Sequence, residues 1–456
     1  MQSKHCKFAK NFHYLRVVNS IKVFNPEHDM ALANGDRHFI APRNIREMAC
    51  DLAPLLEFVE GDEILVWGWD HAIKTRPLRM GIAEECLPTD AALTVLRACS
   101  ERQSAHQLLR AFHADHPDGP YTGESTLVHN IDDIASYATQ HGHIILKDPL
   151  SSSGKGLRHV NEGGLPLPPS QPKVDARRGR SQGGGTSEPS EQSRGGMSAS
   201  SLEKVKSWAN ALIHRHGYLT AEPYYDKVQD FAMEFCVREE QCRFIGYSLF
   251  STNPHGRYES NLLMADEKIE ALLRQYIPQS ALHEVQEWVM SNSLRIIPSE
   301  WDTTRHPLYF GIDMMIVKTT NNVRTSEHDA SLPTNRSAST DELNTKFNSQ
   351  LSTPNFQFKL HPCVEINLRL NMGIIAHEVH QHLLTPDTEG SFHVTSFPNG
   401  EAAQLFYKEH TEQYPSIYQE EKITSGYLPL TPIYPHTRHH AYIIVTRPVS
   451  PKDSFR

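Results

Sequence analysis

A loop of small residues flanked by lysines is the strongest chemical signal in the chain. An apolar run, residues 144–146, ends at Lys147, and the loop after it carries serines, glycines and a second lysine. Small residues let backbone N–H groups approach a polyphosphate closely, while the lysines supply positive charge. The GxxxxGK[ST] spacing of a Walker A loop is absent, and a Ser/Gly hairpin with solvated lysines is the alternative interpretation. The loop residues that we expect to contact phosphate are Ser151, Ser152, Ser153, Gly154, Lys155 and Gly156.

Two apolar strands further along the chain carry side chains that suit a metal ion. Asp313 lies inside one of them, while Glu365, Asn367 and Arg369 occupy alternate positions on the other. Because side chains alternate across a strand, these three share one face. Carboxylate and amide oxygens suit Mg²⁺, and an arginine beside them would neutralise phosphate charge. We therefore predict metal ligation by Asp313, Glu365 and Asn367; a strand with its polar face in solvent is the alternative.

A third polar cluster follows the first predicted strand, residues 21–24. It contains Asn25, Glu27, His28 and Asp29. Ligands of open α/β sheets bind at the carboxyl ends of strands, so this cluster is a candidate substrate site. Its acidic residues would favour a cationic or amine-bearing group, and a capped surface turn is the alternative. Arg257, between two predicted strands, is a further candidate for contact with phosphate or a substrate carboxylate.

The chain contains 27 histidines, which could indicate a metal site with histidine ligands, but their spacing does not support one. His377 and His380 are three residues apart, whereas the HExxH motif of zinc proteases needs a spacing of four. A histidine cluster on a helix surface is the better interpretation. We also expect His436, His439 and His440 to be solvated.

Alternating strands and helices predict an α/β domain at the N-terminus, followed by a mostly antiparallel region. Predicted helices span residues 90–112 and 130–137, and predicted strands span residues 21–24, 64–67, 143–147, 231–237, 243–250, 309–318 and 356–367. Residues 179–201 contain almost nothing apolar, and residues 319–353 are rich in Asn, Ser and Thr. Such segments cannot bury enough surface to offset their ordering entropy, so we expect disordered insertions.

Composition narrows the class of protein. The 456 residues carry 45 basic and 54 acidic side chains, a net charge of −9, which argues against a general nucleic-acid-binding surface. Seven scattered cysteines without a CxxC pair argue against a disulfide framework or a zinc ribbon. No signal peptide and no apolar run of membrane-spanning length is found. We expect a soluble cytoplasmic protein that binds neither nucleic acid nor membrane.

The lysine strand, the small-residue loop, the Asp strand and the Glu-x-Asn strand, in this order, resemble the ATP-grasp superfamily of ATP-dependent ligases. The resemblance extends from about Ser100 to Arg369. It implies a chain of α/β and α+β class, with an N-terminal α/β domain before a two-lobed ATP-grasp fold. The implied domains are an N-terminal domain (1–115), a small lobe (116–220, with an insertion at about 162–201), a large lobe (221–430, with an insertion at about 319–353) and a C-terminal extension (431–456).

The resemblance also implies roles for individual residues. Glu222, Tyr224 and Tyr225 match the hinge that meets adenine. Asp230 matches the acidic residue that binds the ribose hydroxyls, with Glu234 as the competing candidate. Gln103 stands where the family often has a first nucleotide-binding lysine, so Lys147 takes that role. Lys147 and Arg369 are the implied catalytic cations.

The implied reaction is carbon–nitrogen bond formation. ATP would phosphorylate a small-molecule or peptide carboxylate to an acyl phosphate, which an amine or similar nucleophile would attack. The implied cofactors are ATP and one or two Mg²⁺ ions, with Mn²⁺ as a substitute, and a homo-oligomer is compatible with the sequence. The alternatives are a phosphotransferase on the same fold and a non-catalytic nucleotide-binding module.

Overall fold

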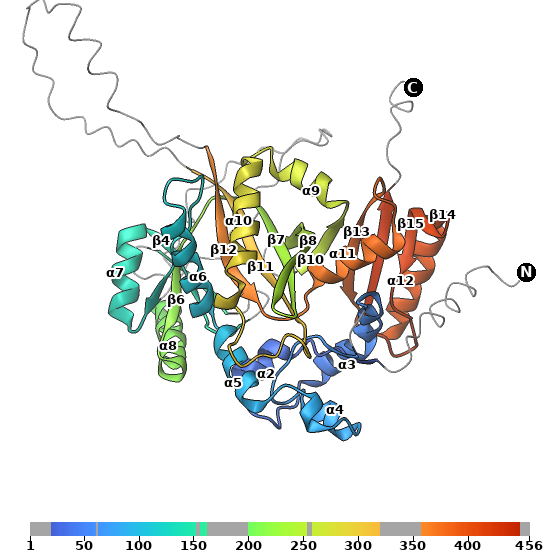
Figure 1. The fold of residues 1–456 in the computed structure, drawn as a ribbon, viewed down its shortest axis with the longest axis horizontal. Helices are drawn as coiled ribbons and strands as arrows, with labels where there is room; N and C mark the ends of the chain where they lie inside the picture. Colours follow the sequence, from blue (N-terminus) through green and yellow to red (C-terminus); the bar gives the residue numbers. More distant parts are fainter. Residues whose placement is uncertain are drawn as a thin grey trace, which may run out of the picture.

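The computed structural model describes residues 20–60, 63–151, 156–161, 199–252, 258–319 and 357–446 (Figure 1). The predicted insertions fall largely on residues 162–198 and 320–356, which lie outside the described residues. The end of the first insertion was predicted wrongly, because helix α8 (Ala199–His216) already begins before residue 201.

The N-terminal part is a small α/β unit, drawn in blue in Figure 1. Strands β1 (Ile21–Val23) and β2 (Ile64–Val66) pair in parallel, as the sequence predicts. Its helical elements are α2 (His28–Asn34), α3 (Arg43–Leu52), η1 (Ala53–Phe58), α4 (Thr75–Arg79) and η2 (Glu84–Cys86). The predicted helix over residues 90–112 is two helices, α5 (Asp90–Cys99) and α6 (Arg102–Asp115). The break between them places Ser100 and Glu101 at a turn.

The small lobe is a four-stranded antiparallel sheet with two helices on one face. Its strand order is β3 (Thr126–Val128), β6 (Leu219–Pro223), β4 (His143–Lys147) and β5 (Leu157–Asn161). Helix α7 (Ile131–His141) ends at Gly142, whose φ of 75° lets the chain turn directly into β4. Ile144 and Leu146 pack against α7 and α8, so the alternate residues of β4, including Lys147, occupy the opposite face.

The large lobe is a second four-stranded antiparallel sheet, in the order β12 (Phe358–Asn367), β11 (Leu308–Lys318), β7 (Lys227–Arg238) and β8 (Gln241–Ser248). One face is apolar: Phe235, Phe310 and Ile366 belong to a core that also contains residues of α5, α6 and α10 (Gln279–Ser291). The opposite face carries Asp313 and Glu365, which lie directly across from each other in the ladder. The predicted antiparallel sheet and its two unlike faces are therefore confirmed.

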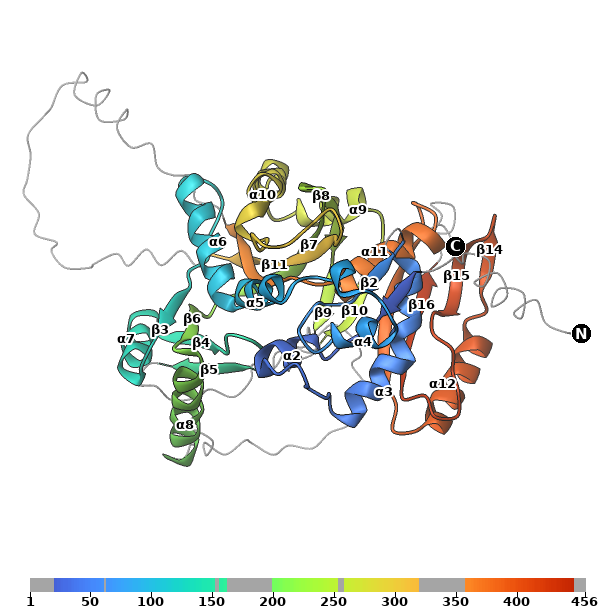
Figure 2. The ribbon, with the colours of Figure 1, turned by 60° about the horizontal axis from the view of Figure 1, so that its bottom comes forward.

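A six-stranded antiparallel sheet completes the fold. Its order is β14 (Ile417–Gln419), β15 (Lys422–Pro429), β16 (His439–Thr446), β13 (Glu389–Ser396), β10 (Tyr258–Leu263) and β9 (Phe250–Thr252). The accompanying helical elements are α9 (Asp266–Leu273), η3 (Ser293–Arg295), α11 (Met372–Leu383) and α12 (Gly400–Gln413). Figure 2 shows strands β14, β15 and β16 of this sheet on one side of the molecule and the small lobe on the other.

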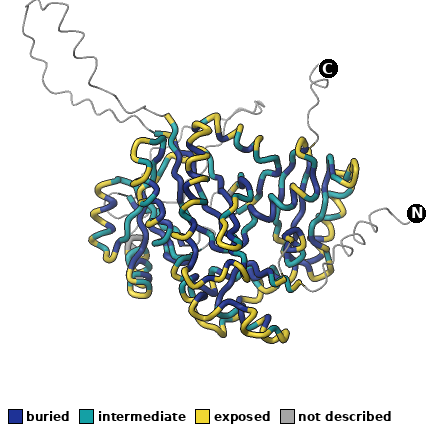
Figure 3. Tube along the Cα trace, viewed as in Figure 1, coloured by how far each residue is buried: buried dark blue, intermediate teal, exposed yellow. Residues whose placement is uncertain are grey.

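The predicted C-terminal extension at residues 431–456 is wrong, because β16 lies between β15 and β13 in the sheet. Burial follows the sheets, with exposed residues on the outer turns and helix faces (Figure 3). The predicted solvation of two histidines is also wrong: His439 and His440 are buried, and both ring nitrogens of His440 bond to hydroxyl groups, those of Tyr427 and Thr431. His436 is exposed as predicted, whereas His380 is buried rather than part of a surface cluster.

Two further findings hold for the described residues. None of the helices among them is both long and apolar enough to cross a membrane. All six cysteines among them are free thiols, which agrees with the scattered spacing.

Candidate active site

The lysine at the end of β4 is buried and paired. Lys147 Nζ lies 2.5 Å from Glu222 Oε2, and both side chains are almost completely buried. The register of β4 against β6 places the two residues on the same sheet face, two positions apart. Lys147 and Glu222, predicted respectively for phosphate and for adenine, thus form one ion pair in the ligand-free protein.

The two predicted metal carboxylates lie opposite each other on neighbouring strands. Burial raises the pKa of Asp313 to about 7, and the negative charges of Glu365 and Asp230 add to this shift. A nearby cation would favour the ionised form of a carboxyl group in this environment. Within the described residues no three His, Cys, Asp or Glu side chains gather closely enough to hold a metal by themselves. The donor set of two carboxylates and the Asn367 amide nevertheless fits Mg²⁺, which commonly completes its shell with water and phosphate oxygens.

Arg102 is the residue that sequence reasoning missed. It is the first residue of α6, and it is buried. Its Nη2 lies 3.2 Å from Glu365 Oε1 and donates to Ser151 O at 3.2 Å, while Nε donates to Asp148 O at 3.1 Å. One guanidinium therefore joins the segment after β4 to strand β12. The available signal was a basic residue directly before Gln103, the position compared with the family's lysine.

Arg369 links the end of strand β12 to the N-terminal unit. Its Nε and Nη2 donate to the two carboxylate oxygens of Asp29 at 3.1 and 2.9 Å, and Nη2 also donates to Asn367 Oδ1 at 3.1 Å. Such a bidentate pair fixes the guanidinium plane. The predicted substrate residue Asp29 and the predicted catalytic residue Arg369 are thus brought together.

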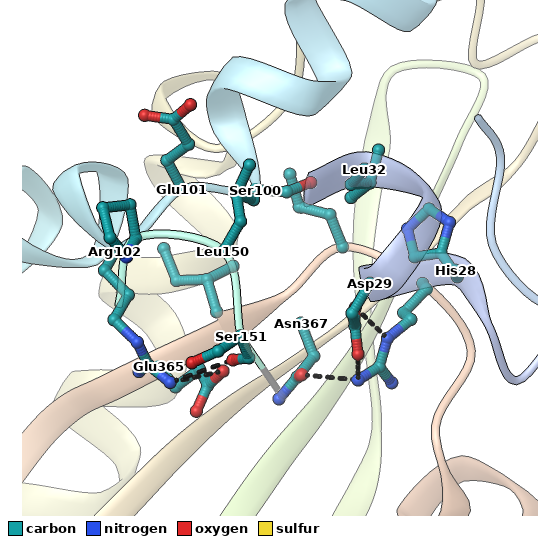
Figure 4. Close-up of a pocket in the computed structure, with 14 residues that line it drawn as sticks. His28, Asp29, Leu32, Ser100, Glu101, Arg102, Leu150, Ser151, Glu365 and Asn367 are labelled. Atoms are coloured by element: carbon teal, nitrogen blue, oxygen red, sulfur yellow. Dashed lines mark hydrogen bonds and ion pairs between the residues drawn. The ribbon is translucent and has the colours of Figure 1, made fainter. Parts of the chain in front are cut away.

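Asp29, Arg102, Glu365 and Arg369 line one small pocket (Figure 4), whereas Lys147 and Asp313 are not among its lining residues. Its volume is about 20 Å³. Helix α2, the α5–α6 turn, the loop after β4 and strand β12 each contribute to its wall. The lining residues are His28, Asp29, Leu32, Ser100, Glu101, Arg102, Pro149, Leu150, Ser151, Glu365, Ile366, Asn367, Leu368 and Arg369.

The predicted adenine hinge lies at the edge of the small lobe. Tyr224 is 41% exposed and stacks on His143, with 4.2 Å between ring centroids. The Tyr225 hydroxyl accepts from the backbone N–H of Glu124 at 2.8 Å, and its ring meets His361 edge to face. Both tyrosines therefore have aromatic neighbours where the chain passes from β6 to β7.

The two ribose candidates differ in exposure. Asp230 is partly exposed and pairs with Lys227. Glu234 is only 1% exposed, and its Oε2 accepts from Asn371 Nδ2 at 2.6 Å. A ligand in solvent can reach Asp230 and not Glu234, so the geometry favours Asp230.

Several predicted residues are used elsewhere or lie outside the described part of the chain. Asn25 is fully buried and its amide bonds to Gly68 and Asp70, so its prediction as a substrate ligand is wrong. Glu27 lies next to the α2 terminus, and burial raises the pKa of its carboxyl group. Ser152, Ser153, Gly154, Lys155 and Arg257 lie outside the described residues, whereas Ser151 and Gly156 border the loop.

Two antiparallel lobes thus present a lysine and a loop on one side, and the Asp and Glu-x-Asn strands on the other. The strand order that the sequence resemblance implies is present, with the lysine strand in one four-stranded sheet and the Asp and Glu-x-Asn strands in another. A scan against models of protein families and a search of curated proteins found no match.

Solved structures are similar to this chain at low sequence identity. One is the N5-carboxyaminoimidazole synthetase of Staphylococcus aureus complexed with ADP, at 10% identity over 96% of this chain and 97% of that one, with a TM-score of 0.41. Another is a biotin carboxylase complex of Campylobacter jejuni, at 11% identity over 88% and 74%, with a TM-score of 0.41. The L-amino acid ligase of Bacillus licheniformis has 10% identity over 90% and 81%, with a TM-score of 0.37. All three TM-scores are below 0.5, so these similarities decide nothing about the activity.

Proposed function

We propose that this chain is an enzyme of the ATP-grasp type, an ATP- and Mg²⁺-dependent ligase that activates a carboxylate for attack by an amine. The observation that carries the proposal is the Asp313–Glu365 pair, two facing carboxylates on neighbouring strands under the influence of two cationic side chains, Arg102 and Arg369. Facing carboxylates are costly to keep ionised without a cation, so the sheet is built to receive positive charge. Cations around that charge suit a polyphosphate.

Three cationic side chains of the candidate site each have a carboxylate partner in the ligand-free protein. The pairs are Lys147–Glu222, Arg102–Glu365 and Arg369–Asp29. Mg²⁺ would be held by Asp313, Glu365 and Asn367 and would supply neutralisation of phosphate charge. Glu365 would then turn from Arg102, whose guanidinium becomes free to contact a phosphoryl group. The nucleotide phosphates would thus replace the carboxylates in existing ion pairs, rather than bind to cations that have no partner in the ligand-free protein.

The chemistry asked of the protein is mainly positioning and charge neutralisation. A substrate carboxylate oxygen attacks the γ-phosphorus, ADP leaves, and the acyl phosphate is attacked at carbon by the acceptor. Lys147 and Arg102 would stabilise charge on the transferred phosphoryl group. Arg369 would orient the acyl phosphate from the side of the N-terminal unit. No side-chain nucleophile takes part in this scheme.

Nucleotide-dependent thermal stabilisation tests the proposal. We expect Mg·ATP to raise the Tm of the parent, and Asp313→Asn and Lys147→Ala to reduce that rise. Loss of one charge-assisted phosphate contact should weaken nucleotide affinity about 10- to 100-fold. Lys204→Ala, at an exposed position of α8, is the matched control and should behave as the parent. No stabilisation of the parent by Mg·ATP would refute the proposal.

Product analysis separates the ligase from the phosphotransferase alternative. A ligase releases ADP and inorganic phosphate together with a condensed product, whereas a phosphotransferase releases ADP and a phosphorylated product. We expect the first pattern when a pool of amino acids supplies both carboxylates and amines.

A further inference from the structure

A histidine and an aspartate of the N-terminal unit form a buried pair behind the pocket. His28 and Asp70 are 2% and 4% exposed, and His28 Nδ1 lies 3.3 Å from Asp70 Oδ2. The other carboxylate oxygen of Asp70 accepts from the backbone N–H groups of Ala72 and Ile73, both at 2.8 Å. The carboxylate is therefore fixed by the backbone, and it fixes the imidazole in turn.

The contact with Asp70 determines which ring nitrogen of His28 is free. A carboxylate beside Nδ1 favours the tautomer that carries its proton there, which leaves the lone pair on Nε2. A Cβ atom at Gly68 would lie 2.5 Å from His28 Cγ, so only glycine allows the backbone to pack against this imidazole. A buried imidazole in one tautomer, oriented by a carboxylate, has the arrangement of a general base.

His28 lines the pocket that also contains Glu365, Asn367 and Arg369. Figure 4 shows His28 and Asp29 on one side of it and Arg102, Glu365 and Ser151 on the other. A volume of about 20 Å³ accommodates about one water-sized group. An amino group has this size. The pocket therefore has room for the reacting nitrogen of an acceptor.

We propose that His28 is the general base for the acceptor amine and that Asp70 is its positioning residue. This inference rests on the proposed function. An amine is protonated near neutral pH and has no lone pair for attack, so a ligase needs a base where the nucleophile binds.

In the proposed step, the ammonium proton moves to His28 Nε2, and Asp70 stabilises the imidazolium. The amine lone pair forms the C–N bond, and the C–O bond to phosphate breaks. Phosphate leaves with that electron pair and takes the second amine proton, so the products are the amide, HPO₄²⁻ and a protonated His28. His28 then returns its proton to solvent.

Kinetics with Mg·ATP and an equimolar mixture of the twenty common amino acids test the role of His28. We expect His28→Asn and Asp70→Asn to lower kcat for ADP release about 100-fold or more, with nucleotide affinity within about twofold of the parent. His38→Asn, at an exposed histidine nearby, is the matched control. Hydroxylamine is a free base at neutral pH, so hydroxamate formation should persist in His28→Asn. If His28→Asn lowers turnover equally with hydroxylamine and with amines as acceptors, the assignment is overturned.

A nitrogen NMR measurement of the imidazole tautomers needs no substrate and decides the inference separately. The His28 signals, identified by their absence in His28→Gln, should report a proton on Nδ1 and a bare Nε2 in the parent. They should change in Asp70→Asn. A proton on Nε2 in the parent would overturn the inference, even if Mg·ATP binds. Failure of Mg·ATP to stabilise the parent would instead refute the proposed function.

Discussion

Asp313 and Glu365 look equivalent in sequence but have different partners. Glu365 pairs with the buried Arg102, whereas Asp313 has a raised pKa and faces negative charge. We expect Asp313→Asn to stabilise the ligand-free protein. Glu365→Gln should destabilise it by about 1–2 kcal/mol, because Arg102 loses its charged partner.

Urea unfolding without nucleotide measures both changes, and Mg·ATP turnover should be lost in both variants. A Glu365→Gln variant as stable as the parent would show that the Arg102 contact contributes nothing. The two results together test whether the carboxylates are as unlike as their surroundings indicate.

Glu234 should make stability fall with rising pH. Burial raises its pKa from 4.5 to about 8. Between these values the folded state holds a proton that the unfolded state has released, so stability is lost as pH rises through this window. Glu234→Gln should therefore gain stability relative to the parent between about pH 5 and about pH 8, measured by urea unfolding. Glu409→Gln, at an exposed position, is the control; a parallel pH response of parent and Glu234→Gln would contradict the prediction.

At the scale of elements, the start of α11 is packed against the site more tightly than its sequence indicates. A Cβ atom at Gly373 would lie 2.2 Å from Glu234 Oε1 and 2.5 Å from Ser248 Oγ. Gly373→Ala should destabilise the protein by about 1–3 kcal/mol, although alanine favours helix by about 1 kcal/mol. Thermal unfolding measures the effect. The loss of stability in the Glu234→Ala/Gly373→Ala double variant should be smaller than the sum of the losses in the two single variants. A higher Tm for Gly373→Ala alone would contradict this packing.

At the scale of the whole molecule, the N-terminal unit and the C-terminal sheet share a core. Leu52 and Leu56 of the N-terminal unit lie in one cluster with Ile374 and Ile443. Ile443→Ala should lower the free energy of unfolding by about 2–5 kcal/mol. The protein should still unfold in a single transition, at a lower temperature than the parent. Ile444→Ala, on the partly buried face of β16, should cost less. A separate, unchanged transition for the N-terminal unit would show that the shared core does not couple the two parts.

The sequence by itself determined what depends on local periodicity. The alternation at Glu365–Arg369 placed polar side chains on one face and Ile366 and Leu368 in the core, because a strand reverses side-chain direction at every residue. The strand that ends at Lys147 was predicted with the bounds that the structure has. The two-lobed arrangement was implied by the resemblance to the ATP-grasp superfamily rather than by local periodicity.

Tertiary structure decided which charges meet. Asp29 and Arg369 are 340 residues apart in sequence, and the Arg102–Glu365 pair joins a helix to a distant strand. No local pattern encodes such contacts, because they depend on which element faces pack together. The same holds for His440, a polar residue that is buried because β16 lies inside a sheet. The hydroxyl groups of Tyr427 and Thr431 form hydrogen bonds with its two ring nitrogens. Side-chain direction follows from the backbone's own geometry, whereas ion pairing and burial follow from the packing of the whole chain.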